Sequence, residues 1–136
     1  MQRTQKRAVL AVSPFDEDRT ALSMILSRTP WEYHYVRSCK DAWKLLHAMR
    51  VDIVLTELNF PDGCTWRGLL DEIKAMRDAP PVIVCCRSVD HRLWTEVLSE
   101  GAYDLLEKPF DRTEVIRIIS AAAIQQRLPN RQIVRA

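Results

Sequence analysis

The sequence predicts a doubly wound α/β fold, in which one parallel five-stranded sheet is covered by helices on both faces. Short apolar runs of strand length alternate with segments of helical periodicity, and this pair of elements occurs five times along the chain. The chain has 136 residues, 47% of them hydrophobic, which suits one compact domain. Successive strand–helix units of this kind are joined by right-handed crossovers.

The first two units are predicted within residues 8–49. The apolar run 8–12 is too short for a helix and is typical of a strand buried on both faces. A helix over about 16–28 follows, with three acids in its first turn, where the helix dipole favours negative charge. Residues 31–36 combine aromatic and β-branched side chains, as strands do, and Ser38 opens a second helix.

The remaining three units repeat this order. Residues 53–55 form a buried strand, a turn lies at 61–63, and a helix follows over about 66–76. A strand at 81–86 precedes a helix that we expect Ser88 to cap and Gly101 to end. After a short strand at 103–107, Asp111 and Glu114 have the spacing of an N-cap and its partner. Residues 1–125 are therefore expected to form the domain, and 126–136 a basic tail or the start of a linker.

Charge and cysteine content limit the functional classes. Twenty Lys and Arg against eighteen Asp and Glu, spread along the chain, do not indicate a nucleic-acid partner. Cys39, Cys64, Cys85 and Cys86 have neither a CxxC pair nor the spacing of a secreted disulfide framework, so free thiols in a reducing compartment are expected. No apolar run approaches the roughly 20 residues of a membrane span. These features predict a cytoplasmic protein without a membrane partner.

Two segments carry a resemblance to a known family. Residues 51–63, VDIVLTELNFPDG, resemble the third-strand segment of response-regulator receiver domains of two-component systems. Residues 101–110, GAYDLLEKPF, resemble the fifth-strand signature of the same family, and the likeness extends over about 7–125. The resemblance implies a flavodoxin-like fold with strand order 2-1-3-4-5. It also implies a cis bond before Pro109.

The resemblance implies phosphoryl transfer to an aspartate with the help of magnesium, but most of the matching positions have changed. The acidic pair that helps to hold magnesium falls on Ser13 and Pro14, which are poor ligands for a hard cation. The acceptor position is Glu57, one methylene longer than aspartate. The hydroxyl and aromatic switch positions fall on Cys86 and Leu105, and only the family lysine, Lys108, is retained, together with Pro109.

We therefore interpret the chain as a degenerate receiver, or pseudo-receiver, that is not an enzyme, has lost its magnesium site and needs no cofactor. In this interpretation Glu57 forms an ion pair with Lys108. One alternative is a competent atypical receiver that uses Glu57 as acceptor, or the acids at 16–18 in place of the lost pair. Another is a thiol sensor based on Cys85 and Cys86, although adjacent strand residues point to opposite faces.

A pseudo-receiver would act by binding other proteins, with a homodimer as one form. The family commonly uses the face made by the fourth helix, fifth strand and fifth helix, and here Trp94, Leu105 and Ile116 are the candidate contact residues. Because the chain ends soon after the fifth helix, we expect either a stand-alone regulator or the N-terminal domain of a longer protein.

Overall fold

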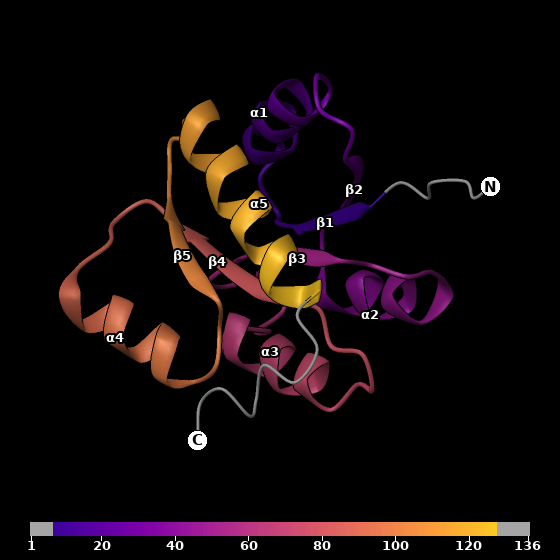
Figure 1. Ribbon diagram of the computed structural model, residues 1–136. Helices are drawn as coiled ribbons and strands as arrows, with labels where there is room; N and C mark the ends of the chain where they lie inside the picture. Colours follow the sequence, from indigo (N-terminus) through magenta and orange to yellow (C-terminus); the bar gives the residue numbers. More distant parts are fainter. Residues whose placement is uncertain (1–6, 128–136) are drawn as a thin grey trace.

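A computed structural model describes residues 7–127 and contains the five strand–helix units that the sequence predicts (Figure 1). The elements are β1 (Ala8–Val12), α1 (Asp16–Leu26), β2 (Glu32–Val36), α2 (Cys39–Ala48), β3 (Ile53–Glu57), α3 (Trp66–Lys74), β4 (Val82–Cys86), α4 (His91–Ser99), β5 (Asp104–Glu107) and α5 (Arg112–Arg127). The strands form one parallel sheet in the order β2-β1-β3-β4-β5, which confirms the expected topology.

Helices cover both faces of the sheet, and each face has its own hydrophobic cluster. Leu22, Leu26, Val115 and Ile119 pack from α1 and α5 onto one face. On the other face, Leu46 of α2, Leu69 and Ile73 of α3 and Val97 of α4 pack together. The strands β1, β3 and β4 are buried on both sides, which explains why they read as continuous apolar runs in the sequence.

The helix termini agree with the sequence at two of three predicted caps. The hydroxyl of Ser38 accepts a hydrogen bond from the Asp41 amide, and Asp111 accepts one from the Glu114 amide. Ser88 does not cap α4. That role belongs to Asp90, whose carboxylate accepts a hydrogen bond from the Leu93 amide at 2.8 Å. Both residues are good N-caps, and the hydrophobic pattern of the helix does not choose between neighbouring starts.

Two conformational expectations are confirmed. The Lys108–Pro109 bond is cis, and Gly101 has a φ of +107° just after α4, a conformation that glycine adopts without steric cost. Helix α5 continues to Arg127, two residues into the segment expected to be a tail, and the rest of that segment, 128–136, lies outside the described residues.

The expectation of four free thiols is wrong for two of them. Cys39 and Cys64 form a disulfide, with their Cα atoms 6.6 Å apart. Cys39 begins α2 and Cys64 lies in the loop between β3 and α3, so both are found at the edge of the sheet where the strands end. Their separation of 25 residues hides this proximity, because only the parallel sheet brings the two segments together. The argument for a reducing compartment loses the support of this pair.

Candidate functional site

The carboxyl ends of the strands bring together the positions that the sequence singles out. Ser13 follows β1, Glu57 ends β3, and Lys108 follows β5, where its amide donates a hydrogen bond to the carbonyl of Cys86 at 2.8 Å. In open parallel sheets this edge is where ligands bind and reactions occur. The fold therefore assembles a candidate site from segments that are far apart in the sequence.

The centre of the site is the ammonium group of Lys108, which is only 5% exposed. Its Nζ donates a hydrogen bond to Asp18 Oδ2 at 2.8 Å and a second one to Glu57 Oε1. The predicted ion pair between Glu57 and Lys108 is present, and Asp18 extends it to two carboxylates on one cation. The phenyl ring of Phe15 lies 5.0 Å from Nζ and adds a cation–π contact.

Ser13 takes part in the same network. Its hydroxyl donates a hydrogen bond to Asp18 Oδ2 at 2.7 Å and accepts one from the Phe15 amide at 3.1 Å. The Tyr35 hydroxyl donates to the carbonyl of Ser13, which ties β2 to this turn. Ser13 therefore orients Asp18 toward Lys108.

The three acids at the start of α1 have different roles. Asp18 is buried and faces the site, whereas Asp16 and Glu17 are exposed and form ion pairs with Arg37 and Arg87. The idea that the three act as one cluster is not supported by this arrangement. Sequence reasoning did not find the contact between Asp18 and Lys108, although Asp18 belongs to the same helical face as the buried Leu22.

The electrostatic balance at Lys108 keeps its side chain charged. Burial pushes the pKa of Lys108 down, but the hydrogen bonds and charges of Asp18 and Glu57 outweigh this effect and raise its pKa. A cavity of about 10 Å³ beside these groups has room for about one water molecule at most. The site is thus a largely buried ion-pair network.

Cys85 and Cys86 lie on opposite faces of β4, as the alternation of strand side chains requires. Cys85 belongs to the core beneath α1 and α5, and Cys86 to the core beneath α2, α3 and α4. Burial raises the pKa of both thiols, and nearby Glu57 adds to the effect at Cys86. Neither cysteine forms a disulfide. The raised pKa values disfavour the thiolate, which is the reactive form of cysteine.

The proposed contact face contains a groove of about 600 Å³ between α4, β5 and α5. Trp94 is 44% exposed and lines the groove together with Val89 and Pro109. Leu105 differs from the expectation, because it is only 8% exposed and belongs to the core. Leu105 contributes a wall of the groove, whereas Ile116 is half-buried on α5 and does not line the groove.

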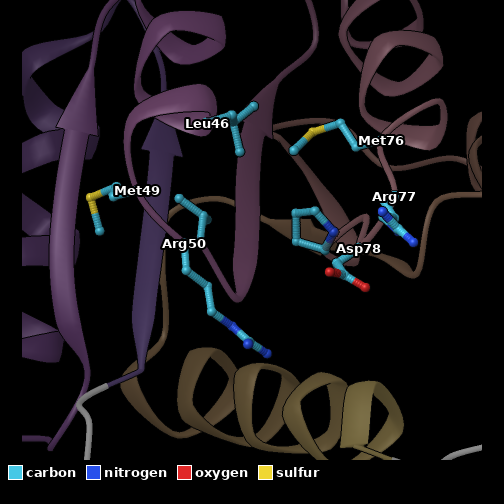
Figure 2. A pocket seen from close by; sticks show the side chains of 8 residues that line it. Leu46, Met49, Arg50, Met76, Arg77 and Asp78 are labelled. Carbon is cyan, nitrogen blue, oxygen red and sulfur yellow. The ribbon is translucent and has the colours of Figure 1, made fainter.

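Another hollow, of about 310 Å³, lies at the opposite edge of the sheet (Figure 2). Leu46, Met49 and Met76 supply its apolar part, and Arg50 and Arg77 its basic part. These residues precede β3 and β4, so the hollow lies at the amino ends of the strands. It is separate from the site around Lys108.

This fold and these strand-end positions define the class of the protein as a receiver domain. The sequence model of the family "Response regulator receiver domain" matches residues 9–120, and the chain belongs to this family. A solved signal receiver domain of an HD domain-containing protein from Pseudomonas fluorescens is similar, with a TM-score of 0.82, 25% identity and 93% of each chain covered.

Curated relatives are of two kinds. The DNA-binding transcriptional regulator NtrC of Rhizobium meliloti is 35% identical over 76% of this chain, but the match spans only 21% of NtrC. The two-component response regulator ORR5 of Oryza sativa is 33% identical, with 82% of this chain and 85% of ORR5 covered. The chain thus spans about a fifth of the NtrC relatives and most of ORR5. The beryllofluoride-activated NtrC4 receiver domain dimer has the same fold, with a TM-score of 0.80.

Within residues 7–127, no helix is both long and apolar enough to cross a membrane. In the same range, no group of three or more His, Cys, Asp and Glu side chains is placed to hold a metal ion.

Proposed function

We propose that this chain is a receiver domain that has lost phosphorylation and acts by binding other proteins. The observation that carries the proposal is the ammonium of Lys108, which is held between the carboxylates of Glu57 and Asp18. One oxygen of the carboxylate at the acceptor position, Glu57 Oε1, is held by this buried cation, and the side chain is one methylene longer than aspartate, which shifts its other oxygen away from the position of an in-line attack. The site residues then have a structural role.

The donor set supports the loss of the magnesium site. Magnesium takes oxygen ligands in a near-octahedral arrangement and keeps several waters. Pro14 has no side-chain oxygen, the Ser13 hydroxyl is bonded to Asp18, and both carboxylates at the site are bound by Lys108. The residues present do not fit magnesium.

Intact-mass measurement with acetyl phosphate and magnesium tests the proposal. We expect no phosphoryl adduct and no change in melting temperature. An adduct present in the wild type and absent from Glu57→Gln would instead establish the atypical receiver. A competent receiver of known activity, treated in parallel, shows that the phosphodonor works.

We place the protein-binding surface on the groove between α4, β5 and α5. Its walls combine the apolar side chains of Trp94 and Leu105 with the acids Glu107, Asp111 and Glu114. The exposed indole of Trp94 is the kind of anchor that dominates protein interfaces. A second copy of the chain is the partner to test first.

Sedimentation velocity over a range of concentrations tests this surface. Trp94→Ala and Ile116→Glu should each weaken self-association without changing the melting temperature by more than a few degrees. Met24→Ala is the matched control, because Met24 is an exposed apolar side chain on α1, away from the groove. If the wild-type chain remains monomeric at every concentration, the homodimer proposal is wrong. If all variants associate as strongly as the wild type, this surface is not the interface.

We further propose a cytoplasmic location, on the basis of the family. A thiol sensor at Cys85 and Cys86 is not favoured, because both side chains are buried and their pKa values are raised.

A further inference from the structure

The structure places a cysteine pair in the loop that directly follows the acceptor position. Cys39 is the first residue of α2, and Cys64 lies seven residues after Glu57, between β3 and α3. Their disulfide joins these two segments across 25 residues of sequence. It is distinct from Cys85 and Cys86, which are buried within β4.

We propose that Cys39 and Cys64 are a reversible thiol–disulfide site, and that reduction loosens the tip of the loop 58–65, residues 61–64, beside α2. This rests on the cytoplasmic location proposed above, because disulfides in a reducing compartment are usually transient and take part in redox sensing or catalysis. A receiver-family chain with a disulfide at the edge of its site therefore suggests control by oxidation. The proposal does not depend on whether Glu57 accepts a phosphoryl group.

A reductant has access to this disulfide. A pocket of about 360 Å³ is lined by Cys39 and Cys64, with Lys40, Trp43 and Glu72 around them. Cys64 is half-buried and is preceded by the exposed Gly63. The pocket has room for a small thiol, whereas Cys85 and Cys86 are buried within β4.

The exchange has a favoured direction. The thiolate of the reductant attacks Cys64 Sγ, the disulfide bond breaks, and its electron pair leaves on Cys39 Sγ. A thiolate at Cys39 stands at the first position of α2, where the helix dipole stabilises negative charge, so Cys39 is the better leaving group. The second thiol of the reductant then attacks the mixed disulfide. This releases Cys64 and leaves the reductant as its own disulfide; two electrons and the two protons of the reductant's thiols end on Cys39 and Cys64, and with glutathione a second molecule supplies the second thiol.

The loop that the disulfide holds is closed mainly by its own hydrogen bonds. The Phe60 amide donates to the Cys64 carbonyl at 2.9 Å, and the Cys64 amide donates to Asp62 Oδ1 at 3.0 Å. An isolated bridge pairs Asn59 with Thr65. These bonds keep the loop folded on itself, and the buried Phe60 packs in the same core cluster as Ala42 and Leu46 of α2. The disulfide is the covalent tie between the exposed tip of the loop, residues 61–64, and α2. Reduction should therefore loosen this tip, while Phe60 keeps the start of the loop in place.

The test uses the chain purified without reductant and equilibrated with dithiothreitol or glutathione buffers that cover a series of redox potentials. Acid quenching, denaturation and alkylation then count the thiols by mass. We expect two thiols to appear in one two-electron transition within the glutathione range, and to disappear again on reoxidation. Limited proteolysis should cut within 58–65 several-fold faster in the reduced form.

Two variants separate the pair from the other cysteines. Cys64→Ser should show fast cleavage of the loop whatever the redox buffer, and Cys86→Ser should keep the full redox response of the wild type. If the variants do not fold, reduction of the wild type supplies the same comparison. Four thiols in oxidised glutathione, or a disulfide that resists excess dithiothreitol in the folded chain, would overturn the proposal. Equal cleavage rates of the oxidised and reduced forms would do so as well.

Discussion

Replacing Lys108 with methionine tests the ion-pair network directly. Methionine has a similar length and no charge, so the substitution leaves Asp18 and Glu57 facing each other without a cation. Breaking a buried pair by removing one partner costs about 3–5 kcal/mol. The cost at pH 7 is limited, because one carboxyl can take up a proton, which costs about 4 kcal/mol for an ordinary carboxyl. We therefore expect a loss of about 3–4 kcal/mol in the free energy of unfolding.

Urea unfolding at pH 7 and at acidic pH measures this loss. The loss should shrink as the pH falls toward about 4.5, since protonation then relieves the repulsion at little cost. Adding Glu57→Gln to the methionine variant should restore at least half of it, because a single carboxylate then remains beside Ser13. Lys44→Met, at an exposed lysine, is the control and should change the stability by less than about 0.5 kcal/mol. A loss below about 1 kcal/mol, or one equal at both pH values, would refute the reasoning.

Three further outcomes follow from the same structure. The pKa of Lys108 is raised above its ordinary 10.5, so the stability that its charge contributes is complete below pH 10.5 and is lost as the pH rises through the raised pKa. Raising the pH through this range should therefore lower the melting temperature of the wild type more than that of the methionine variant. Gly101→Ala should cost about 1–2 kcal/mol in urea unfolding, because φ is +107° and the new Cβ would lie 3.3 Å from Lys74 Nζ. Reducing the disulfide between Cys39 and Cys64 should lower the free energy of unfolding by about 3–4 kcal/mol, as calorimetry can measure.

The fold was predictable because its strands and helices each carry a local signal. The buried strands β1, β3 and β4 are continuous apolar runs, and the helices show their core-facing positions at helical spacing. The ends of the helices were predicted less exactly. Helix α1 ends at Leu26 rather than at 28, and Asp90 rather than Ser88 caps α4. At helix ends several residues can serve as caps, and side-chain packing decides among them.

The site was predictable in part. Ser13, Glu57 and Lys108 could be placed together because strand ends meet at one edge of a parallel sheet. The contact of Asp18 with Lys108 was not deduced in the same way, because acids in a first helical turn are common, although the spacing of four residues from Leu22 places Asp18 on the buried face of α1. The disulfide was missed for a related reason. Spacing in the sequence carries no information about two segments that the crossover of α2 brings together.

The retention of Lys108 beside so many changed positions has a physical explanation. A buried ammonium needs counter-charges, and Glu57 and Asp18 supply them without a metal. An aspartate at 57 would have a shorter reach, so the longer side chain helps it to meet Lys108. The same contacts therefore join the ends of β3 and β5 to α1. If phosphorylation is lost, as we propose, a signal would enter elsewhere, and the loop 58–65, tied to α2 by the Cys39–Cys64 bond, directly follows Glu57.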